Sequence, residues 1–172
     1  MGVIADQREA LRALIATVPD IGKVYRYQKL PEADWGHFVE SYSAQIAGYL
    51  SGADHVRAWT VQYVGERRRE YTTNTIGTNK KYDLETDWIV RGYFSLADNE
   101  DEATPSEEVF TDLLEVVADT ILGDPGLGGF ALYQKGDFII DLDRGVPRSF
   151  ADLFVHYAEV RMTYFTHITL TV

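Results

Sequence analysis

Residues 88–122 read WIVRGYFSLADNEDEATPSEEVFTDLLEVVADTIL, and the spacing of the apolar residues changes within this stretch. In its first part, Trp88, Val90 and Phe94 share one face at the two-residue period of a strand. In its last part, apolar residues recur at helical spacing from Val109 to Ile121. Between them, residues 104–107 (Thr-Pro-Ser-Glu) form a capping box with Pro at the first helical position. The stretch therefore predicts a strand followed by a capped amphipathic helix.

Three further stretches are rich in strand-forming residues. Residues 56–64 (VRAWTVQYV) alternate apolar and polar side chains, and residues 153–172 (LFVHYAEVRMTYFTHITLTV) do so over a longer run. Residues 128–143 (GGFALYQKGDFIIDLD) predict a strand pair that turns at Lys135-Gly136-Asp137. The polar segment 66–86 (ERRREYTTNTIGTNKKYDLET) predicts a long hairpin loop at about 65–86, whose Tyr and Thr residues could extend the strands.

The N-terminal third predicts two helices and a short strand. Residues 4–18 are amphipathic at helical spacing and end at Pro19, residues 23–30 (KVYRYQKL) suggest a strand, and residues 32–50 suggest a less regular helix. The resulting order is helix, strand, helix, two strands, helix, strands. We therefore expect one α+β domain over residues 1–172, with a mainly antiparallel sheet covered by two to three helices.

Composition excludes several classes of protein and site. The chain has no cysteine, which removes disulfides, thiolate nucleophiles and Cys-ligated metal sites. A formal net charge of −11 from 27 acidic and 16 basic residues disfavours wrapping of DNA, whose phosphates carry the same sign. No apolar run approaches the roughly 20 residues that span a bilayer, so we expect no membrane partner.

Motifs for chemistry are absent from the sequence. There is no GxSxG, SxxK or HExxH sequence, and the glycines at 126–129 follow a helix, which predicts a plain turn. The histidines form no HxH or HxxxH motif with a carboxylate in ligand register; they are His37, His55, His156 and His167. The acidic residues at 98–102 are expected to be a solvated loop before the capped helix. We predict no catalytic residue, no metal site and no cofactor.

One charged cluster has the opposite sign to the rest of the chain. It contains Arg67, Arg68, Arg69, Lys80 and Lys81, five of the sixteen basic residues. A protruding arm with this charge could dock on an acidic neighbour, such as another copy of the chain. A hairpin tip that simply avoids apolar residues is the alternative interpretation. Reversal of these charges is expected to weaken assembly if the first interpretation holds.

The succession of elements resembles the tail terminator proteins of long-tailed, lambda-like phages. The resemblance is carried by REALRALIATVP, by RAWTVQYV with DWIVRGYFSLADN, by PSEEVFTDLLEVVADTIL and by VHYAEVRMTY. It implies a structural virion protein that forms a hexameric ring, caps the tail tube and presents a surface for head–tail joining. The partners it implies are further copies of the chain, the tail tube protein and a head-completion or neck protein, with DNA passing through the ring. It also implies assembly in the host cytoplasm and a final place at the head-proximal end of the tail.

Other functions stay open on the sequence alone. The related head–tail connector, neck and tail-completion proteins are near alternatives. From another class, a small-molecule-binding or enzymatic α+β domain would show a deep pocket with convergent polar groups. A regulatory partner-binding protein without ring symmetry is a third possibility.

Overall fold

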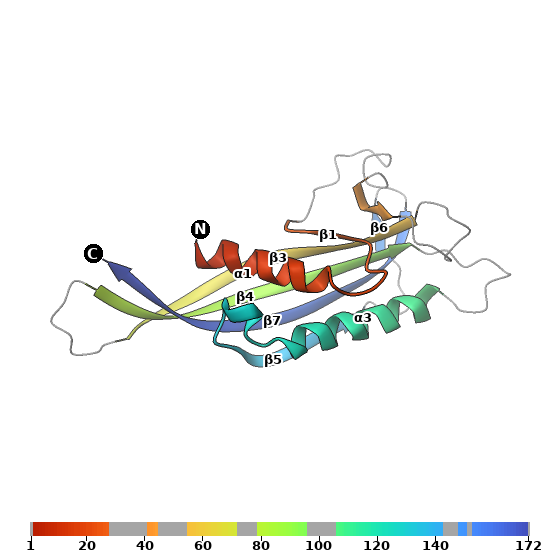
Figure 1. The fold of residues 1–172 in the computed structure, drawn as a ribbon. Coiled ribbons are helices and arrows are strands. Elements are labelled where there is room, and N and C mark those ends of the chain that lie inside the picture. The colour runs from red at the N-terminus through yellow and green to blue at the C-terminus, as the bar shows by residue number, and fades with distance from the viewer. Residues whose placement is uncertain are drawn as a thin grey trace.

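The protein is built on one twisted sheet with both long helices on the same face (Figure 1). The computed structural model describes residues 2–27, 41–44, 55–71, 79–95, 106–142, 148–150 and 153–171. The helices are α1 (Val3–Ile15) and α3 (Ser106–Gly123), followed by the short 3-10 helix η2 (Leu127–Gly129). The strands are β1 (Lys23–Tyr25), β2 (Ser43–Ala44), β3 (His55–Tyr71), β4 (Asn79–Ser95), β5 (Tyr133–Leu142), β6 (Arg148–Phe150) and β7 (Leu153–Thr171).

The strand order is β1-β3-β4-β7-β5, with β2 also paired to β3 and β6 to β7. Among the strands that the structure describes, only the pairing of β1 with β3 is parallel. The three long strands β3, β4 and β7 form the centre of the sheet. An α+β fold with a mainly antiparallel sheet covered by helices is therefore confirmed.

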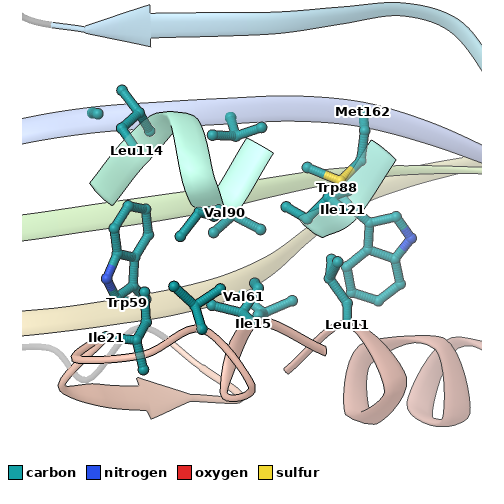
Figure 2. Close-up of a cluster of buried hydrophobic side chains, with 14 of the residues drawn as sticks. Leu11, Ile15, Ile21, Trp59, Val61, Trp88, Val90, Leu114, Ile121 and Met162 are labelled. Carbon is teal, nitrogen blue, oxygen red and sulfur yellow. The ribbon is translucent and has the colours of Figure 1, made fainter. Parts of the chain in front are cut away.

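The main core lies between the sheet and the helices (Figure 2). Leu11 and Ile15 of α1 meet alternate residues of the strands, among them Trp59 and Trp88, which are both 1% exposed. The Trp59 ring lies directly over Gly92 of β4. A Cβ atom at Gly92 would lie 2.7 Å from that ring, so only glycine fits there. The alternation predicted for β3, β4 and β7 is confirmed by this core.

A smaller core occupies one end of the opposite face. It contains Val56, Ala58 and Val155 together with tyrosines that touch edge to face. The ring centroids of Tyr42 lie 5.7 Å from Tyr25 and 5.4 Å from Tyr93, and Tyr93 lies 5.4 Å from Tyr157. Such a row of T-shaped contacts is a favourable way to bury aromatic rings.

Two sequence predictions are wrong, one where β3 ends and β4 begins and one in the edge strand β5. The loop expected at about 65–86 is much shorter, because β3 continues to Tyr71, β4 begins at Asn79, and the pairing holds to Tyr71 opposite Lys81. Cross-strand pairing stabilises strand structure in this polar segment, where the spacing of apolar residues does not predict a strand. The turn expected at Lys135-Gly136-Asp137 is a bulge in the single strand β5, since both halves pair with β7. Gly136, at φ 76°, provides the left-handed conformation that the bulge uses.

The remaining predictions are partly confirmed. Helix α1, strand β1 and helix α3 lie where the sequence places them. Residues 43–44, expected within the helix 32–50, are instead strand β2, because they pair with β3. The rest of that predicted helix lies outside the described residues, apart from positions 41–42, and so do Thr104 and Pro105 of the capping box. Among the helices that are described, none is long and apolar enough to cross a membrane.

Candidate interaction surface

Three strand ends project beyond the helices and form what we call the arm. The arm consists of residues 67–71 of β3, 79–85 of β4 and 165–171 of β7, which are paired in register. In Figure 1 these ends twist away past the N-terminal end of α1. The arm therefore presents both of its faces beyond the cover of α3, and its β3 edge is free of any partner strand within the described residues.

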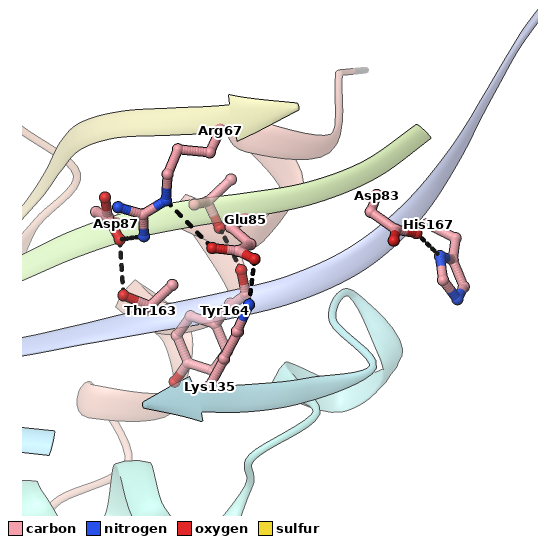
Figure 3. Close-up of polar contacts among 9 residues, drawn as sticks. Arg67, Asp83, Glu85, Asp87, Lys135, Thr163, Tyr164 and His167 are labelled. Carbon is pink, nitrogen blue, oxygen red and sulfur yellow. Dashed lines mark hydrogen bonds and ion pairs between the residues drawn. The ribbon is translucent and has the colours of Figure 1, made fainter. Parts of the chain in front are cut away.

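A ladder of ion pairs crosses the base of the arm on the face opposite the helices (Figure 3). Arg67 donates from Nε to Glu85 Oε2 and from NH2 to Asp87 Oδ1, both at 3.1 Å. Lys135 of β5 reaches the other oxygen of Glu85, and Thr163 of β7 donates to Asp87 at 2.6 Å. The hydrogen bond from Lys135, against the opposing effect of burial, lowers the pKa of Glu85 with help from Arg67. Four strands are thus linked by charge.

The predicted basic cluster does not form one patch. The strand period sends Arg67 and Arg69 to the open face, while Arg68 points to the helix face opposite Leu84 and pairs with Glu66. Lys80 and Lys81 lie in β4, opposite Leu170 and Thr169 of β7. Arg69 is exposed and has no ion-pair partner within the residues described. Of the three arginines, it is the one that makes no ion pair with a carboxylate of the described residues, although Asp83 lies opposite it on β4.

A second polar cluster surrounds Glu159 in the middle of the open face. Arg91 donates from Nε to Glu159 Oε1 at 2.8 Å, Arg161 donates to Oε2 at 2.6 Å, and the Tyr157 hydroxyl also donates to Oε1. Glu159 is only 7% exposed. Burial alone would raise its pKa, but the hydrogen bonds from Tyr157, Arg91 and Arg161 outweigh burial and lower the pKa of Glu159 to about 2. This carboxylate is ionised at neutral pH and fixes three side chains on the sheet.

The β5 edge carries a concentration of exposed apolar side chains. Ile139 is 50% exposed and Ile140 is 45% exposed, although neighbouring strand residues point to opposite faces. Exposed apolar residues continue along the segment that leads into β5; these are Phe130, Leu132 and Tyr133. Within the described ranges β5 pairs only with β7, so its other side offers unused backbone donors and acceptors. An exposed edge strand with apolar side chains is a site where another chain can pair.

The same side of the molecule is acidic. Helix α3 contains no Lys or Arg, and its exposed acidic residues are Glu107, Glu108, Asp112, Glu115 and Asp119. Asp137 and Asp141 of β5 are also exposed. No basic partner of these carboxylates occurs among the side chains that the structure describes. The β5 edge is therefore apolar in the middle and negatively charged around it.

The opposite edge of the sheet is β3, and it differs in character. Its outer side pairs with β2 and β1 only as far as Thr60. From Val61 to Tyr71 no outer partner occurs in the part of the chain that the structure describes. Val64, at the bulge in β3, is 54% exposed, and the arginines of the arm follow. Residues 61–71 hold three arginines and two glutamates, so this free edge has a small excess of positive charge, whereas the β5 edge has exposed carboxylates.

Two features bear on small-molecule or enzymatic functions. A cavity of about 510 Å³ lies between the N-terminal end of α1 and the arm, lined by Gly2, Val3, Ile4, Arg68, Leu84, His167, Ile168 and Thr169. Its polar side chains are already engaged, because Arg68 pairs with Glu66 and His167 Nδ1 lies 2.8 Å from Asp83.

The second feature is a serine–histidine contact, with 2.9 Å between Ser106 Oγ and His156 Nε2. Ser106 is completely buried and the His156 ring stacks on Phe110 at 6.0 Å, so a substrate carbonyl cannot reach this hydroxyl. The contact fixes the start of α3 to β7. No group of three or more potential metal ligands occurs among the described residues.

Sequence reasoning missed the β5 edge and the Glu159 cluster. The signal for the edge was the run Phe138-Ile139-Ile140, where adjacent apolar residues break the alternation of a half-buried strand. Alternation in residues 153–172 places Tyr157, Glu159 and Arg161 on one face, but no sequence signal brought Arg91 of β4 to them. No family model matches the chain, and no curated protein matches it at a significant level.

Proposed function

We propose that this chain is a ring-forming structural subunit of a virion, a tail terminator that caps the tail tube and presents the surface for head–tail joining. The observation that carries the proposal is the contrast between the two free edges of the sheet. One edge is apolar with exposed carboxylates around it, the other carries Arg69 and a small excess of positive charge, and they lie on opposite sides of the same subunit. A subunit with two different, complementary sides assembles head to tail, and such assembly closes into a ring when the rotation between copies permits.

The kind of ring is inferred from the sequence resemblance. In the tail terminators that the chain resembles, six copies form one ring on the end of the tail tube. The expected partners are therefore further copies, the tail tube protein and a neck protein. The net charge of −11 is compatible with a ring through which DNA passes without adhering. The place of action is then the head-proximal end of the tail.

The proposal is tested by the mass and shape of the purified protein. We expect light scattering to give a discrete oligomer of several 19.5 kDa chains, and negative-stain electron microscopy to show rings. Added to polymerising tail tube protein, the rings should bind tube ends and stop elongation. A protein that stays monomeric at high concentration and in the presence of tail tubes would contradict the proposal.

A further inference from the structure

The two free edges of the sheet suggest one specific contact between copies, and this inference rests on the function proposed above. We infer that β5 of one copy pairs antiparallel with the free edge of β3, residues 61–71, in the next copy. The sheet of one subunit would then continue into the sheet of its neighbour. The partner in this contact is a second copy of the same chain.

The direction of the strands supports an antiparallel contact. Three antiparallel steps lead from β3 through β4 and β7 to β5, so β3 and β5 run in opposite directions. A rotation about an axis roughly along the strands keeps the direction of each strand. It therefore sets β5 of one copy antiparallel to β3 of the next, the same pairing that holds the sheet together inside each subunit.

The lengths and side chains of the two edges also agree. β5 has 10 residues, and β3 is free over Val61–Tyr71. Ile139 and Ile140 on β5 and Val64 on β3 are each about half exposed and would be covered together. The carboxylates Asp137 and Asp141 have no basic partner in the described part of their own chain, and Arg69 has no acidic one.

A symmetric contact of β5 with β5 is disfavoured by charge. It would bring Asp137 and Asp141 of two copies together, with the acidic surface of α3 beside them. The bases that the structure describes on β5 and next to it, Lys135 and Arg161, are already paired with Glu85 and Glu159. The free β3 edge, with Arg69 and a small excess of positive charge, has the complementary sign. The heterologous contact is also the one that leads to a ring, whereas a two-fold β5 contact ends at a dimer.

The test uses two variants that each block one edge. Ile139→Lys with Ile140→Lys blocks the β5 edge, and Val64→Asp with Arg69→Asp blocks the β3 edge. All four side chains are exposed, so each variant is expected to keep the circular dichroism spectrum and melting temperature of the wild-type monomer. Val116→Lys, at an equally exposed apolar position on α3, serves as the matched control and should assemble like the wild type.

Each blocked variant alone is expected to lose the ring and run as a monomer in light scattering. Mixed at equal amounts, the two variants retain one intact edge each, so they should form a dimer of twice the 19.5 kDa chain mass and nothing larger. The inference is overturned if either variant alone still forms rings, or if the mixture stays monomeric while the wild type forms rings. In both of those cases the ring function stands. A wild type that never oligomerises, alone or on tail tubes, would instead overturn the proposed function.

Discussion

Strand β3 has two halves that differ in everything except their pairing with β4. From Val56 to Val61 every residue is buried, whereas from Arg67 to Glu70 every residue is exposed. Both halves pair residue by residue with β4, interrupted only by the bulge at Val64. The difference is that the helices cover one face of the first half and the smaller tyrosine core covers the other, while the arm extends past both.

The two halves of β3 are stabilised by different interactions. In the body, apolar burial against the helices supplies most of the folding free energy. In the arm, backbone pairing and ion pairs hold the strands, and exposed ion pairs each contribute little. An arm built this way is a weakly stabilised structure in the monomer, and a neighbouring copy that covered it would add the burial it lacks.

The largest expected effect is the loss of a body residue. Trp59→Ala removes a ring that is 1% exposed, lies over Gly92 and has its centroid 6.1 Å from that of Phe110. We expect the free energy of unfolding to fall by about 3–5 kcal/mol, from lost transfer energy and the cavity left behind. Urea unfolding followed by circular dichroism measures it.

Val64→Ala is the matched control on the same strand. Val64 is 54% exposed, so its truncation should change the free energy of unfolding by no more than about 0.5 kcal/mol. Equal losses for the two variants would show that the halves of β3 do not differ as the burial indicates.

The second effect is a dependence of stability on pH that Glu159 produces. Its pKa is about 2 in the folded protein, below the ordinary value of 4.5, so the unfolded chain binds more protons between these values. The stabilisation is therefore complete above about pH 4.5 and is lost as the pH falls toward 2, and a shift of this size corresponds to about 3 kcal/mol.

Glu159→Gln tests this assignment directly. The variant should be less stable at pH 7, because Arg91 loses its charged partner, and it should lose much less stability than the wild type between pH 4.5 and pH 2. Urea unfolding at a series of pH values gives both slopes. Parallel slopes for the two proteins would assign the acid sensitivity to other carboxylates.

The third effect concerns the attachment of α1 to the body. Gln7 is completely buried, donates to the Phe130 carbonyl at 3.1 Å and accepts from the Thr86 hydroxyl at 2.9 Å. Gln7→Leu leaves both partners without this bond, and we expect a loss of about 1–3 kcal/mol. In a double-mutant cycle, Thr86→Val should lower the free energy of unfolding less in the Gln7→Leu background than in the wild type. If the two losses simply add, the hydrogen bond between Gln7 and Thr86 does not contribute to stability.

Sequence reasoning could predict the body far better than the surfaces. Alternation at Trp59, Trp88 and Val90 gave the strands, and helical spacing gave α1 and α3, because those patterns reflect burial against one partner layer. The part of the arm in β3 and β4 was predicted as a loop because its residues are mostly polar, and Leu84 is its one hydrophobic residue described as buried. Its strand structure depends on pairing between the end of β3 and the start of β4, and on the distant strand β7.

The candidate surfaces were predictable only in part. The charge of Arg67, Arg68 and Arg69 was visible in the sequence, but their division between two faces required the register with β4. Gly136 suggested a turn, and only the continued pairing with β7 shows that it serves a bulge within an edge strand. Edges are set by strand order, which no local pattern contains.

The fourth effect is in the arm. Arg67→Ala removes the ion pairs to Glu85 and Asp87, but the Arg67 side chain is 58% exposed, so solvent screens both. We expect a loss of no more than about 1 kcal/mol at low ionic strength, and less at about 1 M salt, where the screening length is only about 3 Å. Urea unfolding of the monomeric β5-edge variant, with and without Arg67→Ala, measures the effect free of assembly. A loss of several kcal/mol would mean that this ion pair stabilises the arm as burial stabilises the body, and the arm would then need no neighbour to be well ordered.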